Sequence, residues 1–219
     1  MKTRDRILLR SLELFNEQGE RLVSTNHIAA ALGISPGNLY YHFPNKEAII
    51  LALFGQYADQ MQGTLTLPHG RPLTQADKVE LFERILGVLW RYRFLHRDMT
   101  HLVSDDSVLR DTYRAFARQV MVAVRGLYRQ QIESGLMAAS EDEVAALVVN
   151  IWIMATSWVN FLTTTGFYGF AEPLTEDMMR QGIYQVVCLE APYLRGEARE
   201  GLEALKARYG RALRSDELI

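Results

Sequence analysis

The side chains best suited to bind another molecule lie in one short run. Residues 33–43 read Gly-Ile-Ser-Pro-Gly-Asn-Leu-Tyr-Tyr-His-Phe. The Asn38 amide can both donate and accept hydrogen bonds, which suits the edge of an adenine base. Gly37 lets the backbone approach a base closely, and Tyr41 offers a hydroxyl for a phosphate and a ring for a thymine methyl group. These residue types favour contact with nucleic acid.

The residues around this run predict two short helices joined by a tight turn. Ser35 is a suitable N-cap for the second helix, and Pro36 suits its first position. Gly33 can end the first helix in a left-handed conformation. Leu39 and Phe43 are four residues apart and should face inward. That spacing leaves Gly37, Asn38, Tyr41 and His42 pointing outward. A helix-turn-helix presents its second helix to the DNA major groove in this way.

This stretch resembles the DNA-binding signature of the TetR family of bacterial transcriptional regulators. The matching residues are Ile28-Ala29, Gly33-Ile34-Ser35, Leu39-Tyr40-Tyr41-His42-Phe43 and Lys46-Glu47. The close match covers residues 2–54, and beyond it only helical organisation and size agree. Pro36 stands where the family often has a basic residue. The DNA contacts that the resemblance implies are Ser24, Thr25, Asn26, Ser35, Pro36, Gly37, Asn38, Tyr40, Tyr41, His42 and Lys46.

Composition gives weaker guidance. The 219 residues carry a formal net charge of -2, and the first sixty are balanced too, which counts mildly against DNA binding. Positive and negative charges are nevertheless segregated. Arg4, Arg6 and Lys46 flank the motif, whereas acidic residues gather late in the first helix. Cys188 is the only cysteine, so no intramolecular disulfide can form. A buried thiol in a reducing cytosol is expected, with a redox sensor as the alternative.

Hydrophobic periodicity predicts an all-α fold. We expect a three-helix DNA-binding domain over 1–46, a connecting helix over 47–62, and a helical-bundle domain for ligand binding and dimerisation over 63–219. The loop with Pro68, Gly70 and Pro72 is the expected domain boundary. In the first part, Thr3 is the expected N-cap of the first helix. In the second part, the predicted helices cover 75–96, 99–103, 107–134, 140–165, 175–189 and 197–213.

An uncharged run from Val144 to Phe170 is long enough to span a bilayer. Its flanks are acidic and lack the Lys or Arg that anchors a membrane end. A helix that is apolar nearly all round can equally be buried in protein. The family resemblance implies dimerisation through the last long helices, here Val144–Thr165 and Thr175–Leu189. We therefore prefer a dimer helix, and no membrane partner, over a membrane span.

Aromatic residues are plentiful in the second domain, where the resemblance implies an inducer pocket. Most such residues in any helical domain are simply core, and that alternative stays open. Ligand pockets are mainly apolar with a few polar anchors. The residues chosen as pocket walls are Trp90, Tyr113, Phe116 and Trp152, with Arg93 or Asn150 as the polar anchor.

No motif predicts catalysis, a cofactor or a metal. The spacing of His96, Asp98, His101, Asp105 and Asp106 matches no standard ligand pattern. We therefore expect a cytoplasmic, homodimeric repressor that binds a palindromic operator in double-stranded DNA and is released by a small-molecule effector. The competing hypotheses are a membrane-anchored helical protein and a helical enzyme or ligand carrier without DNA activity.

Overall fold

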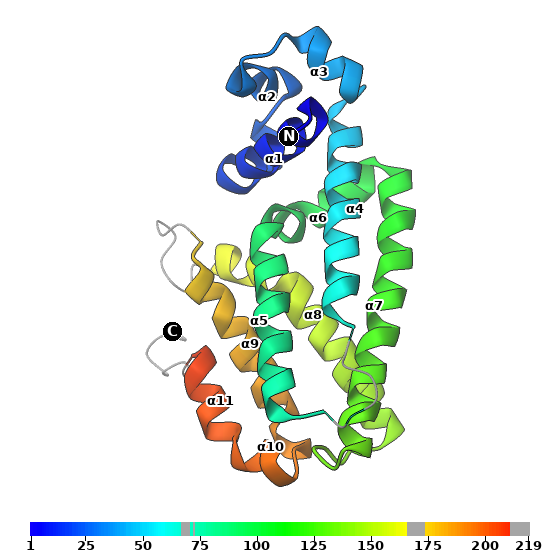
Figure 1. Cartoon of the computed structure of the whole chain (residues 1–219), viewed down its shortest axis with the longest axis vertical. Coiled ribbons are helices and arrows are strands. Elements are labelled where there is room, and N and C mark those ends of the chain that lie inside the picture. Colours follow the sequence, from blue (N-terminus) through cyan, green and yellow to red (C-terminus); the bar gives the residue numbers. More distant parts are fainter. Residues whose placement is uncertain (67–70, 72, 166–173, 211–219) are drawn as a thin grey trace. The chain divides into compact units, whose positions relative to one another are not determined.

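Helices make up the chain in the computed structural model (Figure 1), which describes residues 1–66, 71, 73–165 and 174–210. Within those residues the only β-type pairing is an isolated bridge between Met137 and Leu194, so the predicted all-α fold is confirmed. The chain divides into two compact units. The first comprises Met1–Met61 with Arg91–Phe116, and the second comprises Gln62–Trp90 with Ala117–Ile219.

The first unit holds the helices that carry the predicted motif. Thr3 is the first residue of its first helix and not the N-cap, because Lys2 precedes it in extended conformation. Helices α4 and α7 cross the division between the units, since each contributes residues to both. The elements are α1 (Thr3–Gln18), η1 (Glu20–Leu22), α2 (Thr25–Leu32), α3 (Pro36–His42), α4 (Lys46–Thr64), α6 (Arg93–Asp105) and α7 (Ser107–Glu133).

The prediction of one helix over 75–96 is wrong, because the helix is interrupted at Tyr92. Helix α5 (Gln75–Arg91) ends there, and α6 begins at Arg93 and replaces the short helix expected over 99–103. Asn16 of α1 supports the break: its amide donates to the Arg91 carbonyl at 2.8 Å, and its Oδ1 accepts from the Phe94 amide at 3.1 Å. These bonds replace pairings that an unbroken helix would have made.

An aromatic cluster forms the core of the first unit. The Phe54 and Tyr57 rings of α4 lie 5.5 and 5.2 Å from the Phe116 ring of α7, and the Tyr57 ring lies 5.5 Å from His96 of α6. Burial raises the pKa of Tyr57 far above its ordinary value and lowers the pKa of His96 to about 4. The buried histidine is therefore neutral at physiological pH.

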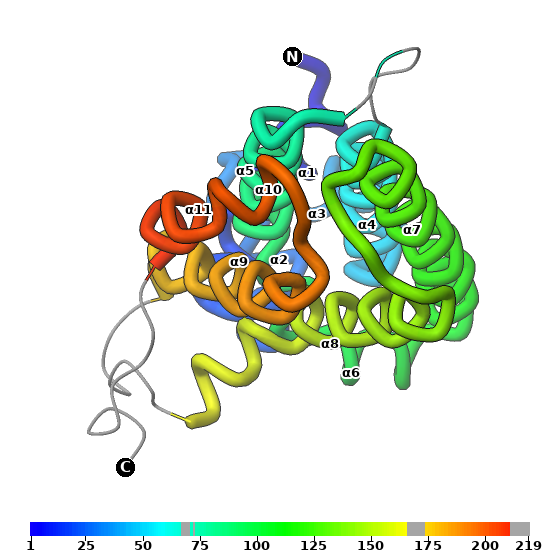
Figure 2. The backbone as a smooth tube through the Cα atoms, turned by 90° about the horizontal axis from the view of Figure 1, so that it is seen from below, coloured from blue at the N-terminus to red at the C-terminus, as the bar shows by residue number. Residues whose placement is uncertain are grey.

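The second unit holds most of α5, the helices that follow α7, and the parts of α4 and α7 that lie outside the first unit. Figure 2 shows α8, α9 and α11 lying next to one another, and contacts join α9 to both neighbours. The predicted polar helix over 197–213 is two short helices instead, with Leu202, Leu205 and Tyr209 buried; residues 211–213 lie outside the described part. Cys188 is half-buried. The new elements are α8 (Glu141–Thr165), α9 (Glu176–Glu190), η2 (Ala191–Tyr193), α10 (Gly196–Glu200) and α11 (Leu202–Tyr209).

A buried ion pair joins α5 to α9 in the second unit. The Lys78 ammonium contacts the Glu190 carboxylate, and these side chains are 9% and 4% exposed. Tyr128 of α7 donates to the same carboxylate at 2.7 Å, and Lys78 also donates to Gln131 at 3.4 Å. Burial, followed by the neighbouring carboxylate, raises the pKa of Tyr128. The hydroxyl therefore stays protonated as a donor, and the network fixes the register of three helices.

Helix α8 begins as predicted. Ser140 and Glu143 form a capping box, in which the Ser140 amide donates to the Glu143 carboxylate at 2.7 Å and the Glu143 amide donates to Ser140 Oγ at 3.3 Å. By length and composition, α8 is the one helix among the described residues that could cross a membrane, yet a core helix can pass the same test. Only 28% of its most apolar stretch is buried. The rest of that stretch is half-buried or exposed within the described residues.

Candidate nucleic-acid interface

The turn between α2 and α3 is fixed by its own backbone. Gly33 adopts the left-handed conformation at φ 65° and ψ 31°, which residues with a Cβ adopt rarely. The amides of Gly33 and Ile34 donate to the carbonyls of Ala30 and Ala29, each at 3.1 Å. These bonds satisfy the last carbonyls of α2 and reverse the chain. Ser35 then caps α3, since its Oγ accepts from the Asn38 amide at 3.2 Å.

The start of α2 is capped as well. Ser24 Oγ accepts from the His27 amide, and His27 Nδ1 accepts from the Ser24 amide, both at 3.3 Å. The two groups satisfy each other's donors as a capping box does. Asn26, in the first turn of α2, is exposed. The Ser24 hydroxyl is therefore engaged within the chain, whereas Asn26 faces solvent.

Helix α3 has a buried side and an open side. Leu39 is fully buried and Phe43 is 3% exposed, and burying such side chains contributes about 1.5–3 kcal/mol each. Tyr41 is 85% exposed. The residues at the amino end, Pro36, Gly37 and Asn38, are also exposed. Leu39 and Phe43 thus face inward, and Gly37, Asn38 and Tyr41 outward, as the spacing predicts. His42, which was also expected to point outward, is half-buried.

The other two aromatic residues of α3, Tyr40 and His42, are less exposed than Tyr41. Tyr40 is 46% exposed, and its hydroxyl lies 3.0 Å from Thr25 Oγ1, which ties the end of α3 to the start of α2. His42 is half-buried and its ring lies edge-on to Tyr41, with 5.1 Å between centroids. Tyr41 is therefore the large side chain of α3 that projects furthest into solvent.

A concavity of about 370 Å³ lies beside these helices. Arg21 and Asn45 line it, although sequence reasoning proposed neither as a contact. Asn45 caps α4, because its Oδ1 accepts from the Ala48 amide at 2.8 Å. Arg21 is exposed and supplies a cation that only its nearness to the motif could have suggested. The full lining is Arg21, Leu22, Val23, Ser24, Thr25, Tyr40, Pro44, Asn45 and Lys46.

Lys46 is engaged inside the unit. Its ammonium lies 2.6 Å from the Glu20 carboxylate and donates to the Glu20 carbonyl at 3.2 Å. The Glu20 side chain is 4% exposed and the Lys46 side chain 24% exposed. Two of the three ammonium protons are thus directed at η1, which leaves one for another acceptor. Lys46 therefore connects the start of α4 to η1, the segment that precedes α2.

The six predicted ligand-pocket residues are divided between the two units. Tyr113 and Phe116 of α7 pack on Phe54 in the first unit, with centroids 6.0 and 5.5 Å apart. Arg93 also belongs to the first unit, and burial lowers its pKa. Trp90, Asn150 and Trp152 belong to the second unit, where Asn150 is exposed and both indoles are half-buried.

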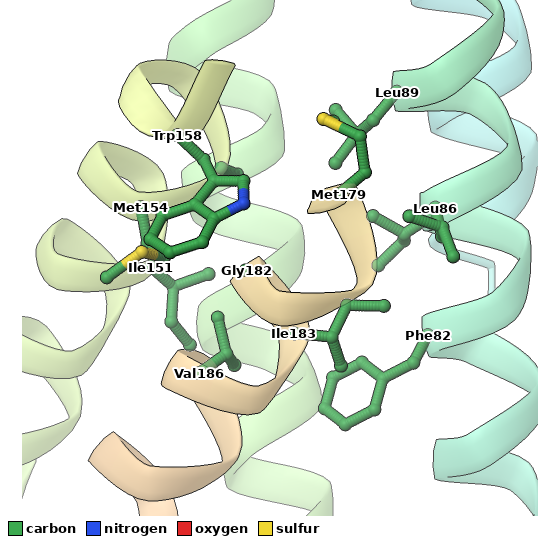
Figure 3. A pocket seen from close by; sticks show the side chains of 12 residues that line it. Phe82, Leu86, Leu89, Ile151, Met154, Trp158, Met179, Gly182, Ile183 and Val186 are labelled. Atoms are coloured by element: carbon green, nitrogen blue, oxygen red, sulfur yellow. The ribbon is translucent and has the colours of Figure 1, made fainter. Parts of the chain in front are cut away.

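A different set of residues encloses an apolar pocket in the second unit (Figure 3). Its cavity has a volume of about 80 Å³. The Trp158 indole of α8 lies against Gly182 of α9 at the pocket, and α5 contributes residues to its lining. The lining is Phe82, Ile85, Leu86, Leu89, Ile151, Met154, Ala155, Trp158, Met179, Gly182, Ile183 and Val186. Sequence reasoning missed it because these residues are ordinary core types.

Metal binding finds no support among the described residues, in which no group of three or more His, Cys, Asp or Glu side chains could hold an ion. The charges near the end of α6 pair locally. His101 Nδ1 lies 3.4 Å from Asp105, and Asp106 accepts from the first amides of α7 at 2.8 and 3.1 Å.

Comparisons with known proteins agree with this geometry. Residues 7–53 match the family model "Bacterial regulatory proteins, tetR family", and residues 56–202 match "Bacterial transcriptional repressor". The HTH-type transcriptional regulator UidR of Escherichia coli K12 is 46% identical over 54 residues, which span 25% of this chain and only 28% of UidR.

Solved structures share the fold. A TetR-family transcriptional regulator from Marinobacter aquaeolei VT8 is 43% identical, with a TM-score of 0.87 over 96% of this chain and 100% of that one. A SmeT–triclosan complex is 18% identical, with a TM-score of 0.59 over 90% of this chain and 93% of that one. The second likeness concerns the fold alone. With most of its length matched by two family models and an exposed, capped α3, the chain belongs to the TetR family of DNA-binding transcriptional regulators, which are not enzymes.

Proposed function

We propose that this regulator is a cytoplasmic, homodimeric repressor that binds a palindromic operator and leaves it when a small molecule binds. The observation that carries the DNA-binding part is the open side of α3, where Tyr41 is 85% exposed beside Asn38 and Gly37. The ring and the hydroxyl of Tyr41 are therefore both accessible to a partner. Two capped helices and a left-handed glycine hold this edge rigid.

Each exposed residue can take a role in a major groove. Gly37 permits close approach of the backbone, and Asn38 can pair with an adenine edge. Tyr41 can contact a thymine methyl group or a phosphate. The start of α2, with Thr25 and Asn26, supplies amides and side chains that suit a phosphate. The remaining predicted contacts are Ser24, Ser35, Pro36, Tyr40, His42 and Lys46.

Dimerisation is supported by the uncovered face of α8. Val149 and Ile153, one helical turn apart, are 50% and 53% exposed. Exposed apolar stripes of this kind mark interfaces with protein or membrane. A second copy related by two-fold symmetry would cover both stripes at once. A palindromic site would require the two α3 helices of the dimer to lie about 34–36 Å apart, or a multiple of that.

Release by an effector requires different affinities of the effector for two conformers. Coupling free energies of this kind are about 1–3 kcal/mol. The structural relative SmeT binds triclosan in its solved complex, which supports a small-molecule partner for the present chain. Helix α4 is the natural lever, because its residues contribute to both units.

Selection of operators from genomic fragments, at low salt, tests DNA recognition directly. We expect one palindrome to be enriched, and Tyr41→Ala to weaken its binding while the dimer persists in size-exclusion chromatography. Val122→Ala is the control, since Val122 is 73% exposed on α7 and should not affect binding. The absence of any enriched palindrome, or equal binding by Y41A, would contradict the proposal. Extraction of the protein only by detergent would favour a membrane role for α8.

A further inference from the structure

The pocket between α5, α8 and α9 offers only hydrocarbon and thioether groups to whatever enters it. None of its twelve lining residues is charged, and none carries a hydroxyl or an amide side chain. The one polar side-chain atom among them is the indole nitrogen of Trp158. Its N–H donates to the Met178 carbonyl at 2.9 Å, so it is already engaged. An ion or a strongly hydrogen-bonding group would lose its water in this pocket without compensation.

The size of the cavity further limits which ligands can enter it. Its volume of about 80 Å³ is roughly half of the 150 Å³ cavity that accommodates benzene in another protein. A hydrocarbon chain is narrower than a ring and can enter such a space lengthwise. Met154 and Met179 line the pocket, and methionine side chains adapt readily to irregular shapes.

The pocket also has a route to solvent. Ile151, Met154 and Val186 line it and are only half-buried. A molecule with one apolar end could therefore insert that end and keep a polar head in water. This arrangement explains why the lining needs no polar anchor of its own.

We propose that this pocket binds the unbranched alkyl chain of a small molecule, with any polar head left in water. The inference rests on the proposed effector-controlled function, because it identifies the chemistry that such an effector would have. Chain length, and not the head group, determines affinity.

Gly182 sets the shape of the pocket. A Cβ at this position would lie 2.9 Å from Trp158 Cδ1 and 3.1 Å from Cγ, closer than packed atoms tolerate. The indole can therefore lie against α9 only because residue 182 has no side chain. Its other neighbour is Phe161, whose ring stacks on it with centroids 5.2 Å apart. Gly182→Ala should push the indole aside and deform the cavity.

Calorimetric titration of the full-length protein, without DNA, tests the chemistry of the pocket. The probes are 1-butanol, 1-hexanol and 1-octanol, together with the carboxylates of the same chain lengths. We expect affinity to rise about fourfold per methylene in both series until the chain outgrows the cavity. Affinity that follows the head group, or that ignores chain length, overturns the proposal.

Two variants locate the binding. G182A deforms the pocket from α9, and Ala155→Leu fills it from α8; both should weaken 1-octanol binding at least tenfold. Gly87→Ala is the matched control, because it makes the same change in α5 where a Cβ meets nothing within 4 Å. Circular dichroism verifies that each variant is folded. If either folded variant binds 1-octanol as the control does, the site lies elsewhere.

A separate arm keeps the two proposals distinguishable. The selected operator is titrated with regulator in the presence of saturating 1-octanol. Loss of operator binding supports both proposals. Retained operator binding together with length-dependent titrations supports the alkyl-chain pocket and contradicts release by this class of effector.

Discussion

Replacement of Lys46 by glutamine separates its structural role from its proposed phosphate contact. In K46Q the Glu20 carboxylate, 4% exposed, loses the cation that lies 2.6 Å away. Breaking a buried ion pair from one side typically costs about 3–5 kcal/mol, because an uncompensated charge stays buried. The Lys46 side chain is 24% exposed, so water can reach part of the gap. We expect a loss near the low end, about 3 kcal/mol.

Chemical denaturation of K46Q, of Glu20→Gln and of the double variant measures this coupling. The double variant replaces both charges by amides of similar shape, so it should lose only about 1 kcal/mol, as for an ordinary hydrogen bond. The double variant should therefore be about 2 kcal/mol more stable than K46Q. Lys2→Gln removes an exposed lysine and serves as the control. If K46Q is no less stable than the double variant, Glu20 does not depend on Lys46.

The same double variant then tests the phosphate contact. Each neutralised phosphate steepens the dependence of log affinity on log salt by about 0.9. If the remaining ammonium proton of Lys46 binds a phosphate, E20Q/K46Q should lower that slope by about 0.9 per subunit. An unchanged slope would assign Lys46 to folding alone. Without the double variant, a weaker affinity of K46Q could reflect partial unfolding.

Three further outcomes follow from single positions. Asn38→Ala should lower discrimination at one operator base pair by about 1–3 kcal/mol, and equal losses on every sequence would make Asn38 a phosphate contact. Lys78→Met should lower the free energy of unfolding by about 3–5 kcal/mol, since Glu190 stays buried without its cation; a loss below about 1 kcal/mol in denaturation would contradict this. Burial lowers the pKa of His96 from 6.5 to about 4, so the unfolded chain binds the proton first and stability falls as the pH drops through that range. The expected loss is about 3 kcal/mol, and a His96→Gln variant with the same acid dependence would refute this origin.

The DNA-binding motif could be predicted because its determinants are local. A cap, a left-handed glycine and two inward residues all lie within eleven positions, and Ser35, Gly33 and Leu39 behave as their types dictate. The capping box at Ser140 is another such case. These features depend on bonds between neighbours in the chain, which a single sequence displays directly.

Distant pairings decided the features that the sequence did not predict. The break at Tyr92 depends on Asn16, more than seventy residues away, which bonds to both sides of the break. Periodicity alone predicts a continuous helix, because the apolar residues keep their helical spacing across the break. The partner of Lys46 was equally hidden. Glu20 precedes it by 26 positions and is a residue type that rarely lies buried without a counter-ion.

None of the residues that the sequence suggested as pocket walls lines the apolar pocket of the second unit. Tyr113 and Phe116 make ring contacts that fill space in the first unit, and a side chain that fills space leaves none for a ligand. The lining of the apolar pocket instead includes Gly182, a residue without a side chain. Gly182 lets Trp158 lie against α9, and the cavity adjoins that contact. The absence of a Cβ at Gly182 matters only because the Trp158 indole packs against it. The location of the pocket therefore depends on the packing of α8 on α9, which composition does not reveal.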